Sequence, residues 1–333
     1  MNALVLGKFK PLHLGHVHVI QTALRNYDHV TVVVCGTRSD KKLYKNRIGW
    51  IENMFSYEEG RDKIKVVYFD STHLCQSDIP SEQNTKPWVD AMQQFGPFDA
   101  IVHSAEYGTL MAEMMNIVSY AVDPERKIWK ISGTQIRNDP YYYWHFIAPT
   151  AKPDLVRTVC IYGPESTGKT MMTNLLARYY FGSEFIEEQA RTLLNGYPLP
   201  SDFPKIGIVQ AGAMLRAKHS TANGLVLSDT DLLTTLIYQQ AYYPYEDWRG
   251  LLVELEEHTK PDYYLLLLNN VPWVRDPLRD FGSAEQRQDM FDNFRKQLVS
   301  RGYPFDVVDS DNFDIRLDQA IYFVNNFLKK EFL

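Results

Sequence analysis

The sequence predicts two α/β domains in tandem, each built on a doubly wound parallel sheet. In the first half of the chain, short runs rich in β-branched residues alternate with helical patterns, and the same alternation begins again near Val156. Between the halves, residues 148–155 contain two prolines and no apolar periodicity, which is typical of a linker. We therefore expect one domain at residues 1–147 and a second at residues 156–333.

Strands are expected where short apolar runs lie between turn signals. In the first domain these are Ala3–Leu6, Val30–Cys35, Ile64–Phe69, Ala100–Val102 and Ile117–Val122, with a further strand-like run at Lys127–Ile131. In the second domain they are Val156–Tyr162, Leu225–Leu227, Tyr263–Leu268 and Phe305–Val308. Helices are expected where apolar residues recur three or four positions apart, as at Val17, Ile20 and Leu24, at Ile48, Ile51 and Phe55, and over Met171–Tyr180, Leu232–Tyr242 and Ala284–Ser300.

Net charge and hydropathy argue against a nucleic-acid-binding protein and against a membrane protein. The chain of 333 residues has a net charge of −6, so it has no general electrostatic attraction for nucleic acid or an anionic membrane. No apolar run approaches the roughly 18 residues of a membrane span, and the N-terminus lacks a secretory pattern, so we expect a cytoplasmic protein. Cys35 and Cys160 lie in apolar runs and are expected to be buried, reduced thiols.

The most specific motif opens the second domain. Residues Gly163-Pro164-Glu165-Ser166-Thr167-Gly168-Lys169-Thr170 match G-x-x-x-x-G-K-[ST] between an apolar strand and a helical run. In such a P-loop, the glycines let backbone N–H groups turn inward around phosphates, and the helix N-terminus adds positive potential. Lys169 is expected to reach the β- and γ-phosphates of ATP, and the Thr170 hydroxyl to ligate Mg²⁺. The alternative is a glycine-rich turn with an exposed lysine.

Two acidic residues end a strand of the same domain. Asp229 and Asp231 follow the apolar run Leu225–Leu227, where the metal-binding carboxylate of a P-loop protein belongs. Asp229 is the first candidate for this role and Asp231 the second, and Asp231 is also a candidate substrate contact. The alternative for each is to cap the N-terminus of the next helix.

Phosphoryl transfer to a sugar hydroxyl also needs a base and cations. Glu188 is the candidate base and Arg191 a candidate substrate contact, against the alternative of an ordinary acidic helix start. Arg275 and Arg279 lie in an irregular segment suited to a lid, where they would neutralise charge on the transferring phosphoryl group. Solvated surface arginines are the alternative there.

The first domain carries a different phosphate motif. The segment Gly7-Lys8-Phe9 leads from the first strand toward His13 and His16, at the start of the first helix. Two histidines three apart at a helix N-terminus can point the same way, and the flanking glycines let backbone approach a polyphosphate. The histidines are expected to donate hydrogen bonds to a phosphate in its transition state. A His-x-x-His metal site is the rival interpretation.

A second segment near the end of this domain extends the same hypothesis. Ser132 and Thr134 carry hydroxyl groups at the start of a predicted helix, and Arg137 follows one turn later. With the backbone N–H groups, they are expected to bind the β- and γ-phosphates of ATP. Taken alone, the segment would be read as a helix cap. Its pairing with the histidine motif in one small domain favours the phosphate interpretation.

These residues carry a family resemblance. The pattern Gly-x-Phe-x-Pro-x-His-x-Gly-His, followed later by Ile-Ser-x-Thr-x-x-Arg, resembles the signature of the nucleotidyltransferase α/β-phosphodiesterase superfamily. Its arrangement in tandem with GPESTGKT, the SDTD strand end and NNVPWVRDPLRDFG resembles the bifunctional NadR family, from Leu4 to about Gly282. The resemblance implies a Rossmann-like nucleotidyltransferase domain followed by a P-loop kinase domain.

The resemblance also implies activities and ligands. The second domain would use ATP and Mg²⁺ to phosphorylate nicotinamide riboside, and the first would transfer AMP from ATP to nicotinamide mononucleotide (NMN), giving NAD and pyrophosphate. His13 and His16 would stabilise the α-phosphate, and Ser132, Thr134 and Arg137 the pyrophosphate. Trp88 would stack on nicotinamide, and Tyr107 would lie near adenine or substrate. Gly49 stands where an arginine or another large side chain would bind substrate, which leaves Arg47 as the nearby candidate.

Two other functions remain open on the sequence. One is that both folds serve other substrates, and the other is that the chain is a nucleotide-sensing regulator without catalysis. The chain begins at the first strand of the nucleotidyltransferase motif, without the helix-turn-helix of some family members, so we expect no DNA binding and no membrane partner. A homo-oligomer is left open.

Overall fold

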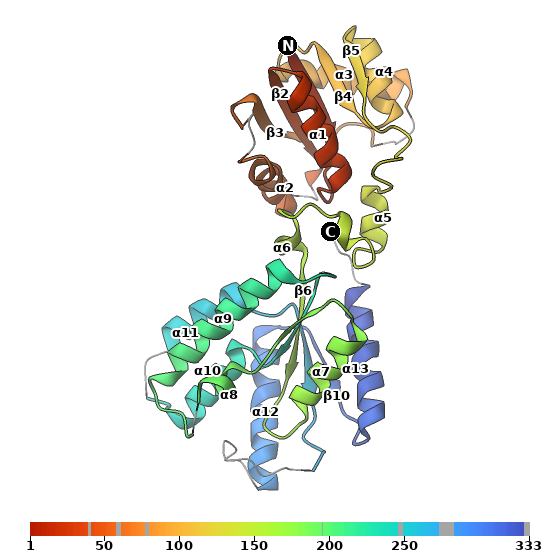
Figure 1. Ribbon diagram of the computed structural model, residues 1–333. Helices are drawn as coiled ribbons and strands as arrows, with labels where there is room; N and C mark the ends of the chain where they lie inside the picture. Colours follow the sequence, from red (N-terminus) through yellow and green to blue (C-terminus); the bar gives the residue numbers. More distant parts are fainter. Residues whose placement is uncertain are drawn as a thin grey trace. The chain divides into compact units, whose positions relative to one another are not determined.

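The computed structural model describes residues 1–38, 41–57, 61–76, 80–194, 196–245, 249–272 and 283–329. The chain divides into two compact units between Asp154 and Leu155 (Figure 1). Each unit is built on a five-stranded sheet in which all pairs of neighbouring strands are parallel. The predicted pair of doubly wound domains is confirmed. No helix in the described ranges has the length and apolar character needed to cross a bilayer.

The strand order of the first sheet reverses beside β1. Its strands, in the order β3-β2-β1-β4-β5, are β1 (Asn2–Gly7), β2 (His29–Gly36), β3 (Ile64–Asp70), β4 (Ala100–His103) and β5 (Val118–Ala121). The chain winds outward from β1 to β3 and then returns to place β4 on the other side of β1. The loops that leave the carboxyl ends of β1 and β4 therefore diverge, and ligands of doubly wound sheets bind at such a reversal of strand order.

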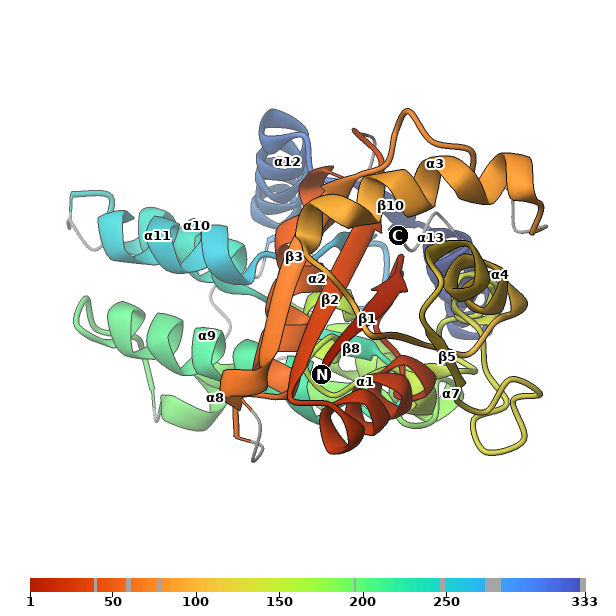
Figure 2. The same ribbon diagram turned by 90° about the horizontal axis from the view of Figure 1, so that it is seen from above.

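Helices cover both faces of the first sheet. They are α1 (Leu14–Asn26), α2 (Lys41–Met54), α3 (Glu82–Met92) and α4 (Glu106–Met115), followed by the shorter α5 (Gly133–Asn138) and α6 (Lys152–Leu155). Figures 1 and 2 show α1 on one face and α3 and α4 on the other. The core on the α3/α4 face joins Leu4 and Val33 of the sheet to Trp88, Met92 and Met111 of these helices. The predicted linker residues contain α6.

One predicted strand is wrong. Residues 127–131 form an irregular loop, not a strand. The Asp123 carboxylate accepts hydrogen bonds from the backbone N–H groups of Lys127, Ile128 and Trp129, at 2.7–3.1 Å. Because these donors are engaged by one side chain, they cannot also join a strand ladder.

The second sheet has the order β10-β9-β6-β8-β7. Its strands are β6 (Arg157–Tyr162), β7 (Glu184–Ile186), β8 (Leu225–Asp229), β9 (Tyr263–Leu267) and β10 (Phe305–Val308). The central β6 lies between β8 and β9, so the loop after β6 emerges at the point where strand order reverses. The edge strand β7 was not among the predicted strands, because three residues give too little alternation to recognise.

Helices also pack on both faces of this sheet. They are α7 (Lys169–Tyr179), α8 (Gln189–Leu193), α9 (Asp202–Ser220), α10 (Leu232–Tyr242), α11 (Arg249–Thr259), α12 (Ala284–Arg301) and α13 (Phe313–Leu328). One core contains residues of α7 and α13, and the opposite core contains residues of α10 and α12. A third cluster joins α9, α10 and α11 (Figure 1). Cys35 and Cys160 are buried free thiols, as predicted.

Candidate active sites

The first site begins where β1 leads into α1. His13 is the N-cap residue of α1, with extended backbone, and it is almost fully buried. A Cβ atom on Gly15 would lie 3.1 Å from the His13 ring, and one on Gly7 would lie 3.0 Å from the Phe9 ring. The glycines of the motif are therefore needed to seat these two rings close to the backbone.

The two histidines form a stacked pair. Their ring centroids are 3.6 Å apart with an interplanar angle of 26°, and His16 Nδ1 accepts the His13 backbone N–H at 3.4 Å. Burial lowers the pKa of His13 to about 4, with a smaller contribution from Arg126. Burial, His13 and Arg126 hold the pKa of His16 well below its ordinary value. Both rings are therefore neutral at pH 7, and buried His13 Nδ1 lacks a partner among the described residues.

The second predicted segment lies against the first. Ser132 caps α5 by accepting the Gln135 N–H at 3.2 Å. Arg137 Nη1 donates to the Lys10 carbonyl at 2.7 Å, and its Nη2 donates to Thr134 Oγ1 at 3.0 Å. A Cβ on Gly133 would lie 3.1 Å from the Lys10 carbonyl oxygen. Residues more than a hundred positions apart thus meet beside the histidine loop, and their joint role in phosphate binding stays a prediction.

Three further predicted residues of this unit lie deeper. Arg47 is 1% exposed, and its Nη1 donates to the carbonyls of Lys8 and Cys35 at 2.7 and 3.0 Å. Trp88 packs in the α3/α4 core, and its Nε1 donates to the Cys75 carbonyl at 3.1 Å. Tyr107 contacts Trp88 edge to face, and its buried hydroxyl has no partner among the described residues. Arg47 thus bonds to the backbone at Lys8, and Trp88 packs in the core of the unit. Contacts of either residue with substrate stay predictions.

The sequence did not point to Arg126, a cation that acts on both histidines. Arg126 lowers the pKa of both imidazoles, so its guanidinium lies within electrostatic range of them. Its backbone adopts φ 51° in the loop organised by Asp123. The sequence offered only Asp123 as a sign of this loop, because an aspartate can accept hydrogen bonds from backbone N–H groups in a turn. Such aspartates are common in ordinary turns, so Asp123 did not point to Arg126.

The second site begins where β6 leads into α7. Gly163 has φ 143°, and a Cβ there would lie 3.0 Å from the Leu267 carbonyl oxygen. Gly168 has φ 86° as the N-cap of α7. Thr167 Oγ1 and Lys169 Nζ both donate to the Pro164 carbonyl, at 3.0 and 2.9 Å. The predicted P-loop therefore has the strand, left-handed glycines and helix that phosphate binding needs.

The two aspartates have different environments. Asp229 is the last residue of β8, and its Oδ2 accepts the Thr170 hydroxyl at 2.5 Å. Its Oδ1 is buried without a partner among the described residues, and burial raises its pKa against the opposing effect of Lys169. A buried, unsatisfied carboxylate oxygen beside a P-loop threonine suits Mg²⁺, which accepts few protein ligands and completes its shell with water and phosphate oxygens.

Asp231 instead caps α10. Its Oδ1 accepts the backbone N–H and hydroxyl of Thr234 at 2.9 and 3.0 Å, and its Oδ2 accepts the Tyr264 hydroxyl at 2.7 Å. Both oxygens have partners and the residue is 3% exposed. The structure therefore gives Asp231 the capping role that was the alternative on the sequence, and its predicted substrate contact is not among these interactions.

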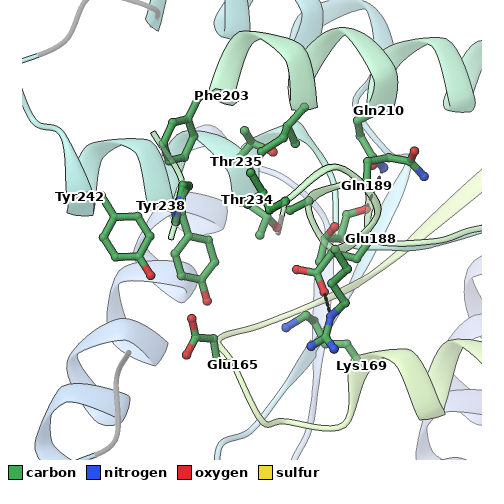
Figure 3. Close-up of a pocket in the computed structure, with 16 residues that line it drawn as sticks. Glu165, Lys169, Glu188, Gln189, Phe203, Gln210, Thr234, Thr235, Tyr238 and Tyr242 are labelled. Carbon is green, nitrogen blue, oxygen red and sulfur yellow. Dashed lines mark hydrogen bonds and ion pairs between the residues drawn. The ribbon is translucent and has the colours of Figure 1, made fainter. Parts of the chain in front are cut away.

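Two adjoining cavities lie above the P-loop. The first spans about 590 Å³, part of it open to solvent, and is lined by Ser166, Thr167, Gly168, Lys169, Thr170, Met171, Glu188 and Arg191. The second spans about 850 Å³, also partly open to solvent, and Lys169, Glu188 and Arg191 line it as well. Arg191 Nε donates to Glu188 Oε2 at 2.5 Å. The predicted base Glu188 and substrate arginine Arg191 therefore form an ion pair that lines both cavities. Figure 3 shows Glu188 in the wall of the larger one.

The larger cavity is rich in aromatic side chains that the sequence did not single out. Phe203 of α9 and Tyr238 and Tyr242 of α10 line one side, and Figure 3 shows the Tyr238 hydroxyl directed toward the Glu165 carboxylate. Gln210 lies at the other end, with its Nε2 3.3 Å from Ser228 Oγ. Aromatic residues at helical spacing usually indicate a packed core, which is why these gave no functional signal. Arg275 and Arg279 lie outside the described residues.

Comparison with known proteins agrees with these two sites. A cytidylyltransferase-like family model matches residues 4–139, and an AAA-domain family model matches residues 158–316. The first match contains the histidine motif and the Ser132–Arg137 segment. The second contains the P-loop, both aspartates and the aromatic cavity.

One relative spans almost the whole chain. It is the trifunctional NAD biosynthesis/regulator protein NadR of Escherichia coli K12, which is 28% identical over 98% of this chain and 83% of its own length. Two solved structures share the fold along both units: NadR in complex with NAD and AMP-PNP, with a TM-score of 0.70 at 22% identity, and NadR in complex with NR, with a TM-score of 0.69 at 23% identity. Each covers 98% of this chain and 96% of the other.

Proposed function

Because the chain belongs to the NadR family, we propose that it makes NAD in two ATP-dependent steps. The second unit phosphorylates the 5′-hydroxyl of nicotinamide riboside, and the first transfers AMP from ATP to the resulting NMN. We assign the steps to residues 156–333 and 1–147, joined by the linker at 148–155. The observation that carries the proposal is the presence, in one chain, of a neutral histidine pair and of a P-loop opening onto an acceptor cavity. We place the enzyme in the cytoplasm, where ATP is available.

In the kinase step, the smaller cavity would take the triphosphate of ATP. Thr170 and Asp229 would hold Mg²⁺, which when bound neutralises charge on the β- and γ-phosphates. Lys169 would move from the Pro164 carbonyl to the phosphates. Glu188 lines both cavities, so a hydroxyl reaching from the larger cavity toward the γ-phosphate would meet its carboxylate. Glu188 would accept the proton, and Arg191 would hold Glu188 in place.

The larger cavity suits a planar, positively charged nucleoside. The aromatic rings of Phe203, Tyr238 and Tyr242 can attract a cation, and the Glu165 carboxylate lines the same cavity, whereas Glu188 is paired with Arg191. Nicotinamide riboside carries such a charge on its pyridinium ring, whereas ordinary nucleosides are neutral. This supports nicotinamide riboside as the acceptor.

In the adenylyl transfer step, the first unit would act by positioning and hydrogen bonding. Neutral His13 and His16 would each donate to the α-phosphate of ATP as the NMN phosphate attacks it. Thr134 and Arg137 would stabilise the departing pyrophosphate, with Ser132 and the Lys8–Phe9 loop around it. No covalent intermediate with the protein is required.

The test is product analysis by mass spectrometry, with MgATP and either nicotinamide riboside or NMN. We expect NMN and then NAD from the riboside, and NAD from NMN. Lys169→Ala should slow the first step on the order of 100-fold or more and spare the second, because it removes a phosphate ligand of the kinase alone. His16→Ala should spare the first step and slow the second.

Two outcomes would contradict the proposal. Wild-type protein that forms neither product would exclude both assigned reactions. Folded variants that each lose both activities would show that the division between the two units is wrong.

A further inference from the structure

The buried side chain of Arg316 contacts the backbone of the P-loop. Arg316 belongs to the first turns of α13 and is 0% exposed. Its Nη2 donates to the carbonyls of Thr167 and Leu268, at 3.1 and 3.2 Å. Its Nη1 donates to Asn270 Oδ1 and the Ser310 carbonyl, both at 2.8 Å. No sequence motif pointed to this residue.

These four contacts join the loops that follow three adjacent strands. Thr167 lies in the loop after β6, Leu268 and Asn270 follow β9, and Ser310 follows β10, in a sheet where β9 lies between the other two. The planar guanidinium presents its donors as a fork, so one side chain can engage all three loops at once. α13 also packs on the loop directly, because a Cβ on Gly168 would lie 3.0 Å from the Phe313 ring.

The position of the Thr167 carbonyl fixes the direction of the Gly168 N–H, a hydrogen-bond donor on the other side of the loop. The Thr167 carbonyl and the Gly168 N–H belong to one planar trans peptide unit, and the two groups point in opposite directions. Because Arg316 holds the carbonyl from behind, the Gly168 N–H points away from α13. Gly168 lines the phosphate cavity. A hydrogen bond to the carbonyl also polarises the peptide and strengthens its N–H as a donor.

The charge of Arg316 adds to this effect. All four acceptors are neutral oxygens, and no carboxylate pairs with Arg316 among the described residues. Burial lowers its pKa, although Asp309 acts in the opposite direction. A buried cation without a paired anion is costly, and a polyphosphate in the adjoining cavity would supply negative charge nearby.

From these contacts we infer that Arg316 is a positioning residue for the ATP triphosphate, acting through the Thr167–Gly168 peptide. The inference rests on the proposed kinase activity of this unit. Arg316 sets affinity for ATP and ADP, and it touches neither the nucleoside acceptor nor the reacting atoms.

The experiment compares Arg316→Lys, Arg316→Met and wild type. It measures the KM for ATP, the KM for nicotinamide riboside and kcat, with ADP binding by calorimetry at a temperature where every variant is folded. Lysine keeps the charge but loses the fork. We expect the KM for ATP and the Kd for ADP to rise about tenfold in Arg316→Lys, as for loss of one charge-assisted hydrogen bond, and further in Arg316→Met. The KM for the riboside should change less than about twofold.

Arg178→Met is the matched control. Arg178 lies exposed on α7, the helix that leaves the P-loop, and its replacement should change none of these constants. Should Arg316→Met fail to fold, Asn270→Ala removes one acceptor of the guanidinium and should give a smaller rise in the KM for ATP.

A merely structural Arg316 would lower the melting temperature and leave the ADP Kd unchanged, and that result would overturn the inference. A parallel rise in both KM values would overturn it as well. The two proposals fail separately, because ADP binding needs no acceptor. Wild-type protein that binds ADP but does not phosphorylate the riboside would refute the kinase assignment while leaving Arg316 testable.

Discussion

At the scale of single residues, the histidine pair derives its chemistry from burial. Two imidazoles stacked 3.6 Å apart cannot both carry a charge at low cost. The surrounding loop removes water from His13, so the neutral form is favoured down to a pKa of about 4. A neutral ring still has one N–H that can donate a hydrogen bond.

The pKa of His13 gives a direct prediction. In the ligand-free protein, the Cε1–H resonance of His13, assigned by comparison with His13→Gln, should stay constant as pH falls from 8 to 5.5 and move only near pH 4. Because the folded pKa lies below the unfolded value, this residue favours the folded state above about pH 6.5 and progressively less as pH falls toward 4. A midpoint near 6.5 would show that the pair is not buried as described.

The two aspartates show what sequence can and cannot separate. Both follow the same apolar run, so both were candidates for the metal site and for a cap. Their roles differ because Thr230, with φ 71°, turns the chain between them. Asp229 then faces Thr170 with one oxygen unsatisfied, while Asp231 faces the start of α10 with both oxygens satisfied. The number of hydrogen-bond partners distinguishes the two carboxylates, and those partners come together only in the folded chain.

At the scale of elements, close packing in the first unit depends on where glycines lie. A Cβ on Gly108, in the first turn of α4, would lie 2.2 Å from the His103 ring at the end of β4. Gly49, inside α2, has no atom within 4 Å of a built Cβ. Gly108 therefore has no room for a side chain, whereas Gly49 has room for one.

This contrast predicts opposite effects of the same substitution. Gly108→Ala should destabilise the protein by about 1–3 kcal/mol, because the methyl group overlaps a ring fixed by its own strand. Gly49→Ala should stabilise it by about 0.5–1 kcal/mol, because alanine favours the helix and meets no obstacle. Urea unfolding monitored by circular dichroism measures both. Equal effects of the two changes would contradict the described packing.

Elements also explain which parts of the sites were predictable. The P-loop and the histidine motif are local, since each needs one strand, one turn and one helix in sequence. The aromatic wall of Phe203, Tyr238 and Tyr242 combines two helices and looks like an ordinary core pattern. Arg316 lies 149 positions from its Thr167 partner. Nothing in its own segment marks it, because its role exists only once β6, β9 and β10 lie side by side.

At the scale of the whole molecule, we propose two catalytic units that work in succession. Each unit has its own sheet and its own reversal of strand order. The family models match the two units separately, whereas the NadR relative spans both. The central claim is that NMN made by the second unit is the substrate of the first.

Mixing two single-site variants tests this claim most directly. His16→Ala should convert nicotinamide riboside and MgATP to NMN and stop, and Lys169→Ala should leave the riboside unchanged. When the two proteins are combined, NMN released by one should be adenylylated by the other, and NAD should accumulate. A mixture that yields NMN from the riboside but no NAD, while Lys169→Ala still makes NAD from added NMN, would contradict transfer of a free intermediate. A mixture that yields neither NMN nor NAD from the riboside would contradict the assignment of the kinase to the second unit.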